Sequence, residues 1–345
     1  MPAQRRALIT GTLFALAAGL MWGLVFIAPT LLAEYPPALL TVGRYLAFGL
    51  IALPLAQIDR HRLAELTRAD WIEAAKLAAV GNLLYYLCLS AAIQRAGGPL
   101  PSVIIGTLPV VIAITAALRA GPEKAMPWAR LAPSLLLIGA GLACVNQAEL
   151  AQLPAAAELS RYGLGALLAV AAAACWTWYP IRNAEWLRAH ADRSPRAWAT
   201  AQGLMTLPMA ALGYALLWLW SSQADAPAFG MQAFEMPLFE MPFGPRPGVF
   251  IGLMLAIGLF ASWLGTLCWN EASQRLPPAL AGQLIVFETL AALGYAFALR
   301  GQWPGWVTAA GVGLLVAGVA TALWPARARP VSAESDLSRS KKGVI

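Results

Sequence analysis

A single glutamate, Glu288, stands inside the apolar run QLIVFETLAAL at residues 283–293. Burying a carboxylate in an apolar medium is costly, so an acid in such a place favours a functional explanation. It could bind the ammonium group of a substrate or carry a proton. The alternative is a structural carboxylate that neighbouring hydroxyls satisfy or that stays protonated and silent. The residues at helical spacing around it are mostly small, including Ala281, Ala291 and Ala292, and would let a ligand or a helix come close.

Arg44 is the counterpart of opposite charge, in another apolar segment. Its guanidinium could bind a substrate carboxylate. It could equally form a buried ion pair that holds two helices together, or extend along its aliphatic stem to the membrane surface. The sequence does not decide among these roles, nor whether Arg44 and Glu288 touch.

Two polar stripes within apolar segments could also contribute to a site. Asn82, Tyr85 and Tyr86 in NLLYYLCLS share one helix face, where they would offer amide and phenol groups beside aromatic surface. Trp263, Thr266 and Asn270 form a similar stripe. For both stripes the alternative is hydrogen bonding between helices, which needs no ligand.

Two further tryptophans occupy equivalent places in two similar stretches. GTLFALAAGLMW at 11–22 aligns without gaps to GALLAVAAAACW at 165–176, so that Trp22 and Trp176 correspond. Deep tryptophans can stack on an aromatic or apolar solute, although helix packing also explains them. If both stretches cross a membrane, as the composition predicts below, the two tryptophans lie at mirrored positions about the bilayer centre. This placement favours a shared pocket.

The composition indicates which elements position these residues. Hydrophobic residues make up 59% of the 345 residues and charged residues only 12%, whereas soluble proteins average about 25% charged. The apolar residues form blocks of roughly 20, the length that crosses a ~30 Å hydrocarbon core as a helix. We therefore predict an all-α integral membrane protein with ten transmembrane helices, at 8–28, 38–57, 71–93, 99–119, 128–147, 162–182, 197–220, 248–270, 278–299 and 304–324.

The basic residues predict the orientation. Of the 24 Lys and Arg, all but six fall in segments on the side of the N-terminus, which places both termini in the cytoplasm. The net charge of +7 thus reflects orientation and gives no reason to expect nucleic acid. The predicted organisation is a first five-helix repeat at 1–147, a linker at 148–161, a second repeat at 162–325, and a disordered basic cytoplasmic tail at 326–345. Because five is odd, the second repeat would be inverted relative to the first.

Several local motifs resemble those of the drug/metabolite transporter superfamily, of the EamA-domain type. The second span carries TVGRYLAFG, similar to an arginine-aromatic element that places Arg44; the fourth carries TLPVV, which places Pro109; the ninth carries FETLAAL, which places Glu288. The sequence departs from the family pattern at two points. Thr289 stands where the family often has proline, which predicts a less kinked helix, and Gln302 replaces a common acidic residue.

The resemblance implies a secondary transporter in the bacterial inner membrane, with export as the usual direction. The aromatic-rich spans look most similar to the aromatic-amino-acid exporter branch, so we expect small amphipathic substrates, first aromatic or other hydrophobic amino acids. A multidrug or other metabolite permease of the same fold is the alternative. The predicted substrate-binding residues are Glu288, Trp22, Trp176, Arg44, Asn82, Tyr85, Tyr86 and Trp263.

Other classes fit the residues poorly. No G-x-x-x-x-G-K-[ST] motif occurs, which argues against ATP hydrolysis by this chain. The four cysteines and two histidines are scattered, so we expect neither a metal site nor a cofactor nor catalytic residues. A membrane enzyme would need clustered acids or histidines, and a channel a polar ring. Besides its substrate, the expected partners are the lipid bilayer and, as an open alternative, protons; the oligomeric state is not predicted.

Overall fold

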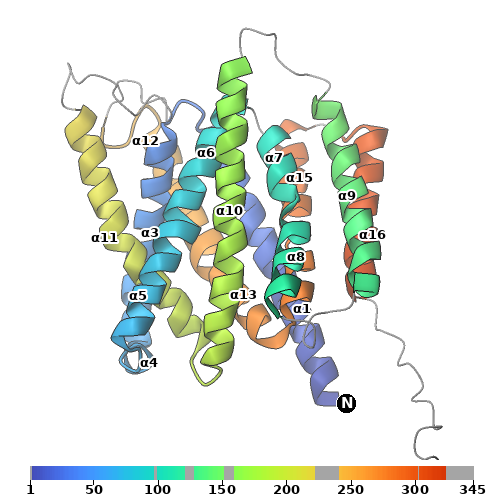
Figure 1. The fold of residues 1–345 in the computed structure, drawn as a ribbon. Coiled ribbons are helices and arrows are strands. Elements are labelled where there is room, and N and C mark those ends of the chain that lie inside the picture. Colours follow the sequence, from blue (N-terminus) through green and yellow to red (C-terminus); the bar gives the residue numbers. More distant parts are fainter. Residues whose placement is uncertain are drawn as a thin grey trace, which may run out of the picture.

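The structure, a computed structural model, describes residues 2–96, 99–120, 128–150, 159–221, 241–301 and 303–323. Every regular element in these ranges is a helix, and the helices stand side by side (Figure 1). This suits a membrane core, where each backbone N–H and C=O needs a partner within its own helix. The predicted tail at 326–345 and most of the predicted linker lie outside the described residues.

Seven described helices are long and apolar enough to cross a membrane: Arg5–Leu31, Pro37–Ile58, Arg68–Ala96, Ser160–Ala189, Pro195–Ser221, Pro247–Arg275 and Leu280–Leu299. Two shorter apolar helices, Ala132–Val145 and Trp306–Thr321, fall at the expected fifth and tenth spans. The expected fourth span is divided between two short helices. The all-helical membrane class is therefore confirmed, while the count of ten spans and the cytoplasmic termini stay predictions.

The first half of the chain contains helices that often continue one another with a change of geometry. They are α1 (Pro2–Gly23), η1 (Leu24–Phe26), α2 (Ile27–Leu31), α3 (Pro37–Ile58), α4 (Arg60–Leu63), α5 (Arg68–Lys76), η2 (Leu77–Leu84), α6 (Tyr85–Ala96), α7 (Pro99–Gly106), α8 (Leu108–Ala120) and α9 (Trp128–Leu150). Thr67 begins α5 with a capping box, in which its side chain and that of Asp70 satisfy each other's backbone N–H groups.

The second half repeats this pattern. Its helices are α10 (Leu159–Ala189), α11 (Pro195–Ser221), α12 (Pro247–Ile257), η5 (Gly258–Leu264), α13 (Gly265–Arg275), α14 (Pro278–Leu284), α15 (Val286–Arg300) and α16 (Trp306–Leu323). Prolines stand at the first position of α11, α12 and α14, where a missing N–H costs nothing.

Two kinds of irregularity recur at equivalent places in the two halves. The expected third and eighth spans each contain a π-helical segment, η2 and η5, and such segments often mark functional sites. The expected fourth and ninth spans are each interrupted, between α7 and α8 and between α14 and α15. The ninth span is interrupted at Ile285 although no proline stands there, and Ile285 keeps helical backbone angles, so a less kinked ninth helix stays a prediction.

The contacts between helices follow the same correspondence. The pair α1 and α13 matches the pair α10 and α6, while α3 packs on α11, and α9 on α16 (Figure 1). The contact of α1 with α15 likewise matches that of α10 with α7. These contacts each join a helix of the first half to a helix of the second.

Candidate binding site

Glu288 lies in the first turn of α15, directly after the break at Ile285. Its backbone N–H donates to the Ile285 carbonyl at 2.9 Å, and its side chain is 2% exposed. The N-terminus of a helix carries a partial positive charge, which stabilises a nearby carboxylate. Helix α1 covers this turn closely, because a Cβ built on Gly19 would lie 3.1 Å from the Glu288 nitrogen. The break in the ninth span thus gives the buried acid a helix terminus of its own.

Arg44 reaches the same region from α3 and is also buried. Its Nε donates to the Ser262 hydroxyl of η5 at 3.0 Å, and its guanidinium carbon lies 4.5 Å from the ring centroid of Tyr86. Arg44 interacts electrostatically with Glu288, but the two form no ion pair in the described part of the chain. Of the three roles open to Arg44, the structure therefore disfavours both an extension to the surface and a structural ion pair.

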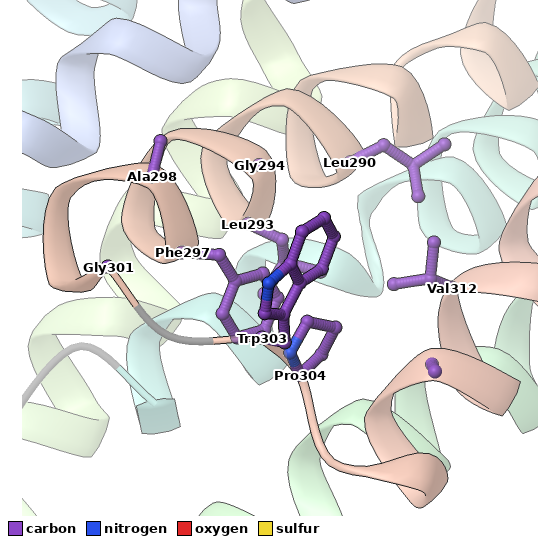
Figure 2. Close-up of a pocket in the computed structure, with 10 residues that line it drawn as sticks. Leu290, Leu293, Gly294, Phe297, Ala298, Gly301, Trp303, Pro304 and Val312 are labelled. Atoms are coloured by element: carbon purple, nitrogen blue, oxygen red, sulfur yellow. The ribbon is translucent and has the colours of Figure 1, made fainter.

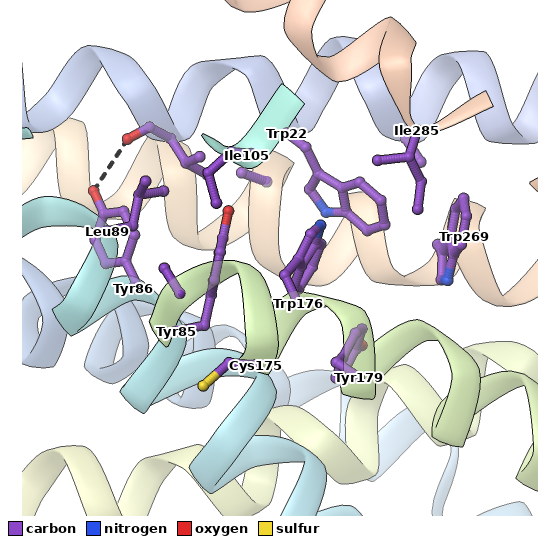
Figure 3. Close-up of a cluster of buried hydrophobic side chains, with 14 of the residues drawn as sticks. Trp22, Tyr85, Tyr86, Leu89, Ile105, Cys175, Trp176, Tyr179, Trp269 and Ile285 are labelled. Carbon is purple, nitrogen blue, oxygen red and sulfur yellow. Dashed lines mark hydrogen bonds between the residues drawn. The ribbon is translucent and has the colours of Figure 1, made fainter. Parts of the chain in front are cut away.

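Aromatic rings from both halves contact one another, and two of them, Tyr85 and Trp176, lie near these charges. Trp22 meets Trp176 edge to face with ring centroids 5.0 Å apart, and Trp176 is stacked between Tyr85 at 4.6 Å and Tyr179 at 5.0 Å (Figure 3). Trp269 lies 5.2 Å from Trp22 on its other side. The correspondence of Trp22 and Trp176 in the two halves thus becomes a direct contact, and these rings form an aromatic wall.

Four residues form what we call the central cluster: Arg44, Tyr85, Trp176 and Glu288. Tyr85 interacts electrostatically with both Arg44 and Glu288, and Trp176 lies beside Glu288. Arg44 Nη1 and Tyr85 Oη are buried without a hydrogen-bond partner among the described residues, and Trp176 Nε1 and Glu288 Oε2 face each other without a well-aligned hydrogen bond. A buried polar atom left unsatisfied costs about 1–3 kcal/mol, so several together indicate a site for a polar ligand.

Three further unpartnered donors come from helices around the central cluster. They are Asn82 Nδ2 in η2, Trp269 Nε1 in α13 and Gln283 Nε2 in α14. All three side chains are buried, and Asn82 precedes Tyr85 by one helical turn. Unsatisfied donors therefore outnumber the single unsatisfied carboxylate oxygen, an arrangement that suits a ligand rich in acceptors.

The remaining predicted residues, Tyr86 and Trp263, form hydrogen bonds with other groups of the protein. The Tyr86 hydroxyl donates to the Val25 carbonyl at 3.4 Å, as the dashed line in Figure 3 shows, while its ring faces Arg44. The Trp263 indole donates to Thr200 at 3.2 Å, and Asn270 accepts from Asn183 at 2.8 Å. The structure therefore favours hydrogen bonding between helices for the stripe of Trp263 and Asn270. The Trp263 ring is not part of the central cluster.

Sequence reasoning missed Tyr179, Gln283 and Ser262. Tyr179 follows Trp176 by three positions and so shares its helix face, a signal that was readable in WTWYP. Gln283 is a polar residue in the apolar run around Glu288, and its type alone could have marked it. Ser262 had no such signal, because its role depends on the approach of Arg44 from a distant helix.

Comparison with known proteins identifies the family. The model of the EamA-like transporter family matches residues 9–145. The inner membrane protein YtfF of Escherichia coli (strain K12) is 50% identical over 324 residues, which cover 94% of this chain and 97% of that protein. The chain belongs to the EamA-like transporter family. A solved crystal structure with 18% identity superposes with a TM-score of 0.65 over 90% of this chain and 96% of the other, which supports the fold alone.

Membership of this family confirms the predicted superfamily. It also confirms the predicted location, a multi-pass protein in the bacterial inner membrane. It makes this EamA-type protein a membrane permease. The resemblance of TVGRYLAFG and FETLAAL to family elements agrees with the family match, although the match itself ends before Glu288.

At one end of this EamA-type protein, acids of the first half face bases of the second. Asp59 at the end of α3 is bonded by Arg196 of α11, with Nε 3.0 Å from both carboxylate oxygens. Arg182 of α10 donates from Nε to Glu73 Oε1 at 2.5 Å and from Nη2 to Glu73 Oε2 at 3.3 Å. Asp70 accepts a hydrogen bond from the Trp186 indole at 2.9 Å. These contacts tie the two halves together at a distance from the central cluster.

Proposed function

We propose that this protein is a secondary transporter of small amphipathic metabolites, with aromatic or other hydrophobic amino acids as the first candidates. The observation that carries the proposal is the central cluster, in which unsatisfied donors and one unsatisfied carboxylate oxygen adjoin the aromatic wall. An α-amino acid presents a carboxylate, an ammonium group and a side chain. Arg44 would bind the carboxylate, Glu288 the ammonium group, and the stacked rings of Tyr85 and Trp176 the apolar side chain.

The proposed mechanism is alternating access around a site near the bilayer midplane, in a chain of ten spans built as two inverted five-helix repeats. The matching π-helical segments and helix breaks of the two halves support this architecture. The ion pairs of Asp59 with Arg196 and of Glu73 with Arg182 join the halves at one end, and would have to separate when that end opens. Export is the direction that the family resemblance implies.

Three related ligands test the assignment of the two charges. L-phenylalanine has both charged groups, phenethylamine lacks the carboxylate, and 3-phenylpropionate lacks the ammonium group. Their binding to the purified full-length protein would be measured by calorimetry. We expect wild type to bind L-phenylalanine at least tenfold more tightly than either analogue, a difference of ~1.4 kcal/mol or more.

Substitutions then assign each charge to a residue. Arg44→Gln should remove the preference for L-phenylalanine over phenethylamine, and Glu288→Gln the preference over 3-phenylpropionate. Glu34→Gln is the matched control, because Glu34 is an exposed acid that pairs with Arg246 far from the cluster. Equal binding of all three ligands by every variant would contradict the proposal. Binding of hydrophobic dyes without any amino acid would favour the multidrug alternative.

Flux measurements separate a carrier from a channel. In proteoliposomes a carrier should take up labelled substrate at a rate that saturates with concentration, because each cycle moves a bound molecule. Uptake that rises linearly over the whole range would contradict alternating access.

A further inference from the structure

A cavity lies between α15 and α16, where Trp303 and Pro304 precede α16. It has a volume of ≈ 600 Å³, and its walls include Leu290, Leu293, Phe297, Trp303, Pro304 and Val312 (Figure 2). The side chains on its walls are all apolar apart from the indole N–H of Trp303. The volume falls in the range of ligand sites, ~300–1,000 Å³, yet the walls lack the charged groups that would hold a polar metabolite.

The dimensions of the cavity match one leaflet of a membrane. Its wall along α15 runs from Leu290 to Gly301, which at ~1.5 Å per residue is ~16 Å. Half of a ~30 Å hydrocarbon core is ~15 Å. At the outer end, Trp303 is 96% exposed, and Trp306, which begins α16, is 82% exposed. Exposed tryptophans of this kind typically lie at the level of the lipid headgroups.

We propose that this cavity binds a single acyl chain of a membrane phospholipid, with the headgroup beside Trp303 and the terminal methyl beside Leu290. Leu280–Leu299 is a candidate membrane span, so the exposed face of α15 would meet hydrocarbon. A groove that is apolar, open and one leaflet deep offers a chain of that length more contact than the flat helix surface nearby. The occupant is a lipid chain rather than a transported amino acid, since no charged side chain lines the walls.

The position of the bound chain relates it to the transport site. Leu290 follows Glu288 by two residues on α15, and both Leu290 and Leu293 also pack against the buried core. The acyl chain therefore fills the outer side of the same half-helix whose first turn carries Glu288. It supports the wall that α15 forms between the membrane and the central cluster.

Photolabelling in lipid nanodiscs tests this site with the full-length protein. The probe is a phosphatidylethanolamine with a diazirine on one acyl chain, and labelled peptides are located by mass spectrometry. A diazirine near the terminal methyl should label the region of Leu290 and Leu293, and one near the carboxyl end the region of Trp303 and Pro304. Labelling spread evenly over exposed apolar positions such as Leu13, Leu136 and Leu167 would overturn the proposal.

A filled cavity provides the second arm. Gly294 lies in the wall, and a Cβ built there meets nothing within 4 Å, so the side chain of Gly294→Phe can start into the cavity. We expect this variant to reduce labelling at Leu290 and Trp303 at least fivefold. Gly252→Phe on α12 is the control, since Gly252 is equally exposed and unobstructed. Unchanged labelling in Gly294→Phe would overturn the site, and loss of labelling on addition of excess L-phenylalanine would assign the cavity to the substrate instead.

Discussion

The indole rings of Trp22 and Trp176 meet edge to face with their centroids 5.0 Å apart, from corresponding positions in two similar stretches of the chain. The same aromatic wall includes Tyr85 of the first half and Tyr179 of the second. Arg44 and Glu288 likewise come from α3 and α15, one from each half. The candidate site therefore exists only where the halves pack together, and neither half contains it alone.

The Trp22 and Trp176 contact should be measurable as a coupling energy. An edge-to-face pair contributes about 0.5–1.5 kcal/mol beyond the area that it buries. We expect Trp22→Leu and Trp176→Leu to destabilise the protein by less in combination than the sum of the two single effects, by about that amount. Unfolding free energies in mixed detergent micelles would show this, and strict additivity would mean that the contact contributes nothing.

Close packing of α1 on α15 should make Gly19 intolerant of a side chain. A Cβ at Gly19 would lie 3.1 Å from the Glu288 nitrogen and 3.2 Å from the Phe287 carbonyl carbon, which are backbone atoms that cannot easily move. Gly19→Leu should therefore destabilise the protein by about 1–3 kcal/mol and weaken substrate binding. Gly313→Leu is the control, because a Cβ at Gly313 meets nothing within 4 Å. Thermal unfolding with binding measurements would check both, and an equal effect of the two variants would contradict the prediction.

The ion pair of Asp59 with Arg196 should contribute more to the free energy of unfolding than the exposed ion pair of Glu65 with Arg193. The Asp59 side chain is 1% exposed and takes several hydrogen bonds from Arg196, so Asp59→Asn should cost about 1.5–3 kcal/mol of unfolding free energy. Glu65 pairs with Arg193 but is 55% exposed, so Glu65→Gln should cost under ~1 kcal/mol. Denaturation in mixed micelles compares the two directly. The ranking fails if Glu65→Gln is the more harmful change.

Substrate binding should depend on pH through Glu288. If its carboxylate binds the substrate ammonium group, protonation removes the charge that attracts the ligand, so affinity for L-phenylalanine should fall as the pH is lowered through the titration of Glu288. The variant Glu288→Gln should bind weakly at every pH, without that slope. Calorimetric titrations across the pH range would test this, and a slope that persists in Glu288→Gln would assign it to another group.

The same titration bears on proton coupling. A proton that competes with the substrate at Glu288 would let an inward proton gradient drive substrate outward. In proteoliposomes of wild type, an imposed pH gradient should then drive accumulation, and in Glu288→Gln it should not. Equal accumulation in both would remove the proton role of Glu288, without affecting the proposed role of Arg44 in binding the carboxylate.

Local features could be read from the sequence because they depend on composition and short spacing. The helical membrane class follows from blocks of apolar residues. The family motifs and the choice of Glu288 as a candidate follow from residues that stand out against an apolar background. The correspondence of Trp22 with Trp176 was visible from an ungapped alignment. The break at Ile285 was not, because no proline or glycine marks that position.

The sequence by itself determined the helical membrane class and marked a few polar and aromatic groups as candidates for a site, since hydrocarbon penalises a polar group unless it has a partner or a ligand. Only the tertiary structure decided which groups meet. In the folded chain Trp263 donates a hydrogen bond to Thr200, and Arg44 donates one to Ser262. Glu288 lies in the first turn of α15, beside Trp176. The physical reason is that hydrogen bonds and ring contacts act over a few ångströms, and helix packing alone brings distant segments that close.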